Sequence, residues 1–131
     1  YRLEGTDVTL TQKDVREVQL AKAAIRAGIE LLAEKLGVEI EDIRKVYLAG
    51  AFGNYLDPAS ACRIGMIPPV RMERSQPIGN AAGEGSKLSA LSAKEFDYAK
   101  ALAANTEFLE LASLPNFNDC YVDALEFAEE E

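Results

Sequence analysis

The sequence predicts a layered α/β fold, because segments with the apolar spacing of helices alternate with at least two short apolar runs. The longest helical pattern follows Thr11 and continues to about Leu36, and the best strand is Val46–Ala49. Two closely spaced glycines, Gly50 and Gly53, come directly after this strand. Since two or three strands make a poor sheet alone, we expect the missing strands in a part of the polypeptide that this chain does not contain.

Length and composition restrict what the chain can be. Its 131 residues suit one domain or one lobe of a larger one, and a formal charge of −8 argues against a nucleic-acid partner. The chain has no apolar run long enough to cross a bilayer and no visible signal peptide, so we expect a cytoplasmic protein with no membrane partner. Tyr1 is not a natural first residue, which favours an excised fragment.

A metal site is not expected in this chain. It lacks His, and its two cysteines, Cys62 and Cys120, are too far apart in sequence for zinc or iron–sulfur spacing. We expect both thiols to be reduced and buried, although the sequence alone leaves a disulfide between them open.

The first helix has recognisable ends. Thr11 is expected to be its N-cap, with Asp14 completing an acidic variant of the capping box, and Gly37 is expected to stop it. Gly28 lies inside the helix, where it costs up to about 1 kcal/mol relative to Ala, so we expect a close packing contact there. The apolar positions at helical spacing are Val15, Val18, Ala21, Ile25, Ile29, Leu32 and Leu36.

The other expected elements are shorter. Asp57 and Pro58 are typical of an N-cap and a first helical residue, and Ser92 with Glu95 forms a capping box. In the first half of the chain we expect a strand or extended entry at Val8–Leu10, a short linker or turn of helix at Glu41–Lys45, a helix from Pro58 to about Ile64 and a strand at Val70–Glu73. In the second half we expect a Gly-rich turn at Ile78–Gly83 leading to a helix that reaches Leu91, a helix from Ala93 to about Ala104, a strand at Glu107–Ala112 and a helix at Phe117–Phe127.

The glycine segment after the best strand is the first candidate site. A strand, a Gly loop and then a helix is typical of a nucleotide site, since Gly lets a ligand approach the backbone and a helix N-terminus offers N–H groups. Such turns also occur for geometric reasons alone, and the aromatic ring in the segment fits either a stack on a base or the core. The candidate residues are Gly50, Ala51, Phe52, Gly53 and Asn54.

Two further groups are candidates for binding. Gly79 and Asn80 begin the second Gly-rich turn, which either touches a phosphate or is only a tight turn. Arg16, Gln19 and Lys22 share one stripe of the first helix and carry groups that can hydrogen-bond a purine, a ribose or a phosphate. The alternative for this stripe is an ordinary solvated face of mixed charge.

No set of residues in the chain forms a catalytic constellation. Asp57 is better explained as an N-cap than as a general base. Without His there is no Ser–His or Cys–His nucleophile, and the sequence contains no GxxxxGK[ST] phosphate loop.

Four sequence blocks, taken together and in order, carry a family resemblance: Thr11–Lys22, Val46–Asn54, Ile64–Pro68 and Gly79–Gly83. They resemble the C-terminal ATPase region of the reductive activators of corrinoid proteins, which belong to the acetate and sugar kinase, heat-shock chaperone and actin superfamily. The resemblance implies the C-terminal lobe of an actin-like, ribonuclease-H-like ATPase fold, with a small mixed sheet packed by helices, as a single fragment over residues 1–131.

The resemblance also implies a function for the full-length protein. Such activators couple ATP, with Mg²⁺, to electron delivery from a [2Fe–2S] ferredoxin domain onto an inactive corrinoid protein or corrinoid methyltransferase of anaerobic metabolism. The ferredoxin domain and the phosphate loops would lie upstream of Tyr1, so the fragment alone is expected to be inactive. The resemblance leaves open whether the lobe forms a homodimer.

For the site, the resemblance implies that Gly50 and Gly53 belong to the adenosine loop of the superfamily. Many members have two adjacent glycines there, whereas this chain has Gly50-Ala51. The helix that carries Arg16, Gln19 and Lys22 resembles the one that lies along the adenosine in chaperone relatives. The alternatives that stay open are an activator ATPase of another anaerobic enzyme and a non-catalytic interaction domain.

Overall fold

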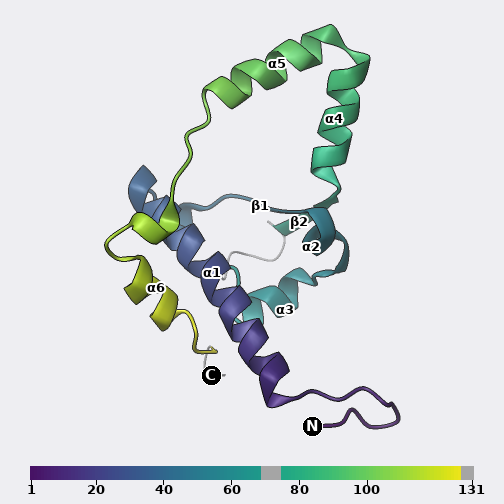
Figure 1. Cartoon of the computed structure of the whole chain (residues 1–131), viewed down its shortest axis with the longest axis vertical. Helices are drawn as coiled ribbons and strands as arrows, with labels where there is room; N and C mark the ends of the chain where they lie inside the picture. Colours follow the sequence, from purple (N-terminus) through teal and green to yellow (C-terminus); the bar gives the residue numbers. More distant parts are fainter. Residues whose placement is uncertain (69–74, 128–131) are drawn as a thin grey trace.

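The computed structural model describes residues 1–68 and 75–127. Its central element is α1 (Gln12–Leu36), which runs diagonally through Figure 1. The elements that follow are η1 (Ile40–Asp42), β1 (Val46–Ala49), α2 (Gly50–Tyr55), α3 (Pro58–Arg63), β2 (Ser75–Gly79), α4 (Ala81–Leu91), α5 (Ala93–Ala104), η3 (Leu111–Ser113) and α6 (Phe117–Asp123).

Both predicted ends of α1 are confirmed. The Thr11 hydroxyl accepts a hydrogen bond from the Asp14 backbone N–H at 3.2 Å, and the Asp14 carboxylate accepts one from the Thr11 N–H at 2.7 Å. Gly37 has a φ of 63°, and its N–H bonds back to the last turn. The packing contact expected at Gly28 is also present, because a Cβ there would lie 3.3 Å from Cδ1 of Leu111.

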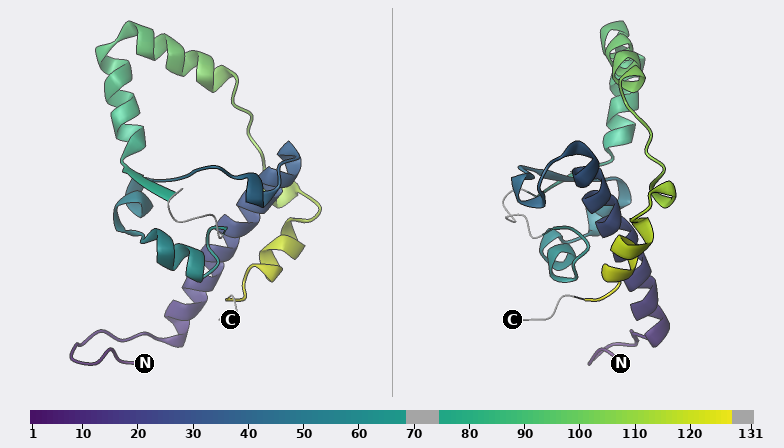
Figure 2. Two further views of the ribbon diagram at one scale, coloured as in Figure 1. Left: turned by 180° about the vertical axis from the view of Figure 1, so that it is seen from behind. Right: turned by 90° about the vertical axis from the view of Figure 1, so that its left-hand side faces the viewer.

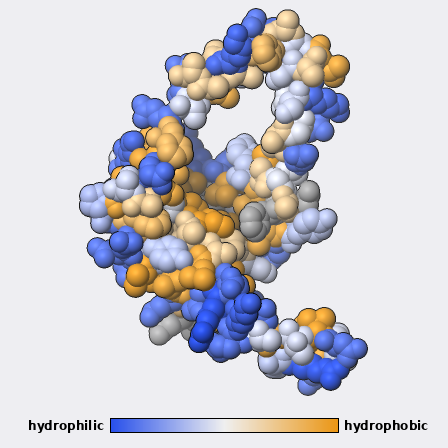
Figure 3. Space-filling model, in the orientation of Figure 1, coloured by the Kyte–Doolittle hydropathy of each residue, from blue (hydrophilic) through white to orange (hydrophobic). Residues whose placement is uncertain are grey.

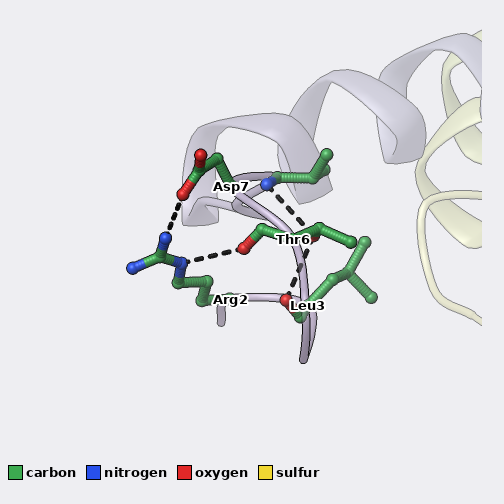
Figure 4. A network of polar contacts seen from close by, with 5 residues as sticks. Arg2, Leu3, Thr6 and Asp7 are labelled. Carbon is green, nitrogen blue, oxygen red and sulfur yellow. Dashed lines mark hydrogen bonds and ion pairs between the residues drawn. The ribbon is translucent and has the colours of Figure 1, made fainter.

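A short hairpin precedes α1. Arg2 and Thr9 form an antiparallel bridge, which confirms an extended entry near the predicted 8–10 segment. Figure 4 shows how side chains close the turn: Arg2 bonds the Asp7 carboxylate and donates from Nε to the Thr6 carbonyl at 3.0 Å, while the Thr6 hydroxyl donates to the Leu3 carbonyl at 3.1 Å. The hairpin is exposed and lies away from the core.

The sheet of the described residues consists of β1 and β2, which pair in parallel. β1 has the predicted bounds, but β2 was not expected, because Pro77 lies within it and proline is rare inside strands. The mixed sheet expected from the family resemblance is therefore a parallel pair here. The strand predicted at 70–73 lies outside the described residues.

The segment after β1 is not the Gly loop that the sequence predicted. α2 begins at Gly50 itself, whose φ of 70° turns the chain from strand to helix without an intervening loop. α3 then begins as expected, since the Asp57 carboxylate accepts from the Ser60 N–H at 2.8 Å and Pro58 is the first helical residue.

A small apolar core joins α1, α3 and β1. Ala61, Met66 and Ile67 are buried in it, and Ile25 and Ile29 of α1 pack against them. Each large apolar side chain buried in this way stabilises the fold by about 1.5–3 kcal/mol. The core therefore fixes α3 against α1. Because α3 follows β1 and α2 in the chain, it also fixes the segment that leaves β1.

The helices α4 and α5 end where the sequence predicted, at Leu91 and Ala104. Asn80 caps α4 by accepting from the Gly83 N–H at 3.0 Å, and the Ser92 hydroxyl caps α5 by accepting from the Glu95 N–H at 3.4 Å. Figures 1 and 2 show both helices projecting from the rest of the described chain.

Two expectations near the C-terminus were wrong. Residues 106–110 carry no regular structure and the 3-10 turn η3 follows, where a strand was predicted, because no neighbouring strand in the described part of the chain pairs with this segment. The final helix, α6, ends at Asp123 rather than near Phe127, because carbonyls of the next three residues turn toward side chains of α1.

The C-cap of α1 gives a stability prediction. Gly37→Ala should lower the free energy of unfolding by about 1–2 kcal/mol, since an L side chain is strained at φ 63°. Gly85→Ala is the matched control, because Gly85 lies within α4 and a Cβ there meets nothing within 4 Å, so this change should raise it by about 0.5–1 kcal/mol. Urea unfolding measures both. Changes of the same sign would contradict the assignment.

The N-cap of α3 gives a pH prediction. Hydrogen bonds from the Ser60 hydroxyl and N–H lower the pKa of Asp57 below its ordinary 3.8. Such a carboxylate stabilises the fold above its ordinary pKa, and this contribution is lost as the pH falls through the lowered value. The urea midpoint of the wild type should therefore fall more steeply below about pH 4 than that of Asp57→Asn, whose amide also caps helices. Parallel pH curves would disprove this role.

Candidate functional site

The two predicted glycine features lie side by side at one edge of the sheet. Because β1 and β2 are parallel, their carboxyl ends meet at the same edge, and Ala49 pairs with Gly79 in the register. Gly50 and Gly79 have φ values of 70° and 61°, which L side chains rarely adopt. The carboxyl edge of parallel strands is where α/β folds commonly bind ligands.

The helices that leave this edge begin at the glycines. α2 starts at Gly50 and contacts both strands, and α4 starts one residue after Asn80. A Cβ at Gly50 would meet nothing within 4 Å, so the backbone there is open on its side-chain side. Ala51, exposed, and residues 52–54 all lie in α2; the side chains of Phe52, Gly53 and Asn54 are outside the described part of the structure.

The Asn80 side chain has a structural task. Its Oδ1 caps α4, and a Cβ at Gly83 would come within 2.4 Å of its Nδ2. The spacing of Asn80 and Gly83 is thus explained by the cap itself. The first N–H groups of a helix have no acceptor within the helix, so those of α4 that the cap does not use are potential donors.

The polar stripe of α1 lies elsewhere and mostly holds the end of α6. The Lys22 ammonium donates to the Ala124 carbonyl at 2.7 Å and also to the Glu126 carbonyl. The Gln19 amide donates to the Leu125 carbonyl at 3.2 Å. We call the side chains of Gln19 and Lys22, together with the carbonyls of residues 124–126, the α6 clamp.

Lys22 is the centre of the α6 clamp. It is only 2% exposed, and its ammonium lies 5.3 Å from the centroid of the Phe127 ring. Burial lowers the pKa of Lys22, and the nearby charge of Arg26 lowers it further. The carbonyl bonds stabilise the ammonium form and oppose this effect.

The two arginines on this face of α1 have different surroundings. Arg16 is exposed, and Arg26 pairs with Glu30 one turn along α1. A cavity of about 360 Å³ lies beside the α6 clamp, but Glu30, Asp123 and Glu126 line it together with the two cations. Three carboxylates make this cavity unsuited to a phosphate.

Figure 1 shows that the two predicted halves of the nucleotide site lie on different sides of α3. The glycine edge and α2 lie beyond the end of β1, whereas the purple half of α1 that carries Arg16 lies at the opposite side of the fold. In the described part of the chain, the glycine edge and this half of α1 therefore lie apart from each other.

The described residues hold no group of three or more His, Cys, Asp or Glu side chains that could bind a metal ion. Asp57 serves as the N-cap of α3, as predicted. Cys62 and Cys120 are free, half-buried thiols, and burial raises the pKa of both. In the same part of the chain, no helix has the length and apolar content needed to span a bilayer.

A family model described as the C-terminal domain of RACo, the ASKHA domain, matches residues 2–131. The chain belongs to this family. The resemblance drawn from the four sequence blocks is thereby confirmed, and the mixed α/β fold agrees with it.

Two curated relatives and one solved structure are similar to this chain. The chain is 44% identical over 119 residues to the "Corrinoid activation enzyme RamQ" of Eubacterium limosum, covering 91% of this chain and 20% of that protein. It is 31% identical over 127 residues to the "[Co(II) methylated amine-specific corrinoid protein] reductase" of Methanosarcina barkeri, covering 94% and 23%. A solved structure, "Reductive activator for corrinoid,iron-sulfur protein", matches with a TM-score of 0.83 and 31% identity over 90% of this chain and 19% of that one.

The chain therefore spans about a fifth of the length of these RACo-like relatives. The pairing of β2 with β1, which brings the two glycine features together, is not predicted from the sequence. The signal for β2 was weak, because Pro77 and Gly79 both disfavour a strand. The α6 clamp was also missed, since nothing local marks a contact between residues about a hundred positions apart.

The α6 clamp predicts a specific loss of stability. Lys22→Met should lower the free energy of unfolding by about 1.5–3 kcal/mol, because it leaves carbonyls without their charged donor. Lys13→Met, on an exposed position of the same helix, should change it by less than about 0.5 kcal/mol. Urea unfolding measures the difference, and hydrogen exchange should quicken in α6 only for Lys22→Met. Equal effects of the two variants would show that the clamp contributes nothing.

Proposed function

We propose that this chain is the ATP-binding lobe of a reductive activator, which couples ATP to electron delivery from an iron–sulfur cluster onto an inactive corrinoid protein or corrinoid methyltransferase. The proposal is supported by membership of the RACo C-terminal ASKHA family. It is further supported by relatives whose names describe corrinoid activation and reduction of a methylated amine-specific corrinoid protein.

The observation that carries the nucleotide assignment is the meeting of Gly50 and Gly79 at the carboxyl edge of the parallel strands. Backbone without side chains lets a flat ring or a ribose approach closely, and first-turn N–H groups of α4 offer donors. Glu84 in the first turn of α4 opposes a phosphate at this place. The edge is therefore suited to the adenosine end of ATP rather than to its phosphates.

The other parts of the reaction belong to the rest of the polypeptide in this proposal. The described residues contain no carboxylate cluster for Mg²⁺, and two distant cysteines do not fit a [2Fe–2S] cluster. This chain would hold adenosine but would not hydrolyse ATP or carry the electron by itself. The partial coverage of its relatives is consistent with such a division.

The α1 stripe has a divided role in this proposal. Arg16 is exposed and available to a nucleotide held between this chain and the rest of the protein. Gln19 and Lys22 would act on the nucleotide only through the α6 clamp, by fixing the end of α6 against α1.

The adenosine assignment predicts the effect of two glycine variants in the full-length protein. Gly50→Val and Gly79→Val should each weaken ATP binding by about tenfold or more, because a branched side chain would occupy the space of the ligand and strain the backbone. Isothermal titration calorimetry measures the affinity. ATP-dependent reduction of the cob(II) form of a corrinoid protein should fall in parallel at low ATP.

Gly37→Val is the matched control, because Gly37 also has a positive φ but lies at the far end of α1. It shares the backbone strain without touching the sheet edge. If Gly50→Val and Gly79→Val bind ATP as tightly as Gly37→Val does, the adenosine site is not at this edge.

A further inference from the structure

The end of the described chain is attached to α1 through the α6 clamp. Whereas α4 and α5 stand apart from the body of the molecule in the space-filling view of Figure 3, α6 lies along α1 in Figures 1 and 2. The Lys22 ammonium, at the centre of the clamp, is buried and donates to the carbonyls of Ala124 and Glu126. Gly65 leaves room for it, because a Cβ there would lie only 3.6 Å from Nζ. The ammonium therefore lies where the residues after α3 and those after α6 both meet α1.

The carbonyls of the clamp follow the end of a helix. The last carbonyls of a helix have no acceptor role within it, and the partial negative charge at a helix C-terminus favours a cation. α6 ends at Asp123, and each of the next three carbonyls accepts a hydrogen bond from a side chain of α1. The middle carbonyl accepts from the neutral Gln19 amide, whereas the two outer carbonyls converge on one ammonium.

Further groups around this point favour a positive charge. The centroid of the Phe127 ring lies 5.3 Å from Nζ, and the face of an aromatic ring attracts a cation most strongly where water is excluded. Glu30, Asp123 and Glu126 line the adjoining cavity of about 360 Å³, where Arg26 is the other cation. Three carboxylates against one arginine leave the ammonium in negative surroundings.

We infer that the carbonyls of Ala124 and Glu126, together with the ring of Phe127, form a binding site for a primary ammonium ion, which Lys22 fills from within the chain. The charge and the N–H donors of Lys22, rather than the volume of its stem, hold residues 124–127 on α1. These four residues, here called the C-terminal strap, stay attached only while a cation occupies the site. The inference goes beyond the proposed function and does not depend on where ATP binds.

Hydrogen exchange of the full-length protein separates charge from volume. Lys22→Met keeps an unbranched stem without the charge, whereas Lys22→Arg keeps both the charge and N–H donors. Amides of α6 and the C-terminal strap should exchange about tenfold faster in Lys22→Met than in the wild type, and Lys22→Arg should restore part of the protection. Lys13→Met, at an exposed position of the same helix, is the matched control and should leave these amides unchanged.

Chemical rescue of Lys22→Ala tests the ammonium site itself. This variant lacks every atom beyond Cβ, so n-propylammonium supplies the missing part of the side chain. Because a tethered group acts at an effective concentration in the millimolar range, a free amine at about 50 mM should slow the exchange of the strap by about threefold. Neither 1-propanol, which lacks the charge, nor tetramethylammonium, which lacks N–H donors, should have this effect.

Two results would show that volume and not the cation holds the C-terminal strap. One is protection in Lys22→Met equal to that of the wild type, and the other is rescue of Lys22→Ala by 1-propanol as strong as that by n-propylammonium. Exchange in Lys22→Ala that n-propylammonium does not slow would also overturn the inference. If Lys22→Ala does not fold, Lys22→Met and Lys22→Arg decide, and equal exchange in these two variants contradicts the ammonium site.

Discussion

The parallel pairing of β1 with β2 is the constraint on which the rest of the arrangement depends. Parallel strands cannot be joined by a tight turn, so the chain must travel from the end of β1 back to the start of β2. Within the described part of that crossover, α2 and α3 lie between the strands, and the core between α3 and α1 anchors it. The pairing also brings Gly50 and Gly79 to one edge, and it directs α4 away from the body.

Local interactions made much of this fold predictable from the sequence. The capping box of Thr11, the stop at Gly37 and the proline start of α3 are each fixed by atoms within four residues, and each is where the sequence predicted it. Distant pairing was not predictable in the same way. β2 contains a proline that argues against a strand, and the segment around Phe108 has a strand-like pattern but finds no partner strand in the described chain.

The same distinction between local and distant interactions applies to the candidate site. The small residues of the glycine features were visible in the sequence, but their adjacency arises only from the strand register. Lys22 and Gln19 belong to a polar stripe for which the sequence predicts nucleotide contacts, and in the structure they bond carbonyls beyond α6, which the sequence does not predict. A side chain's chemistry can be inferred from its type and spacing, whereas its partner is set by tertiary packing. The order of the four blocks was nevertheless specific enough to predict the family, which the RACo match confirms.

Photolabelling of the full-length protein with 8-azido-ATP shows whether the sheet edge at Gly50 and Gly79 holds the adenosine of ATP. The azide sits on the purine, so the label marks whatever lies against the base. If the adenosine lies at this edge, the labelled peptides should contain the start of α2 or the turn into α4, and unmodified ATP should compete the label away. Competed labelling confined to the α6 clamp would show that the adenosine binds elsewhere.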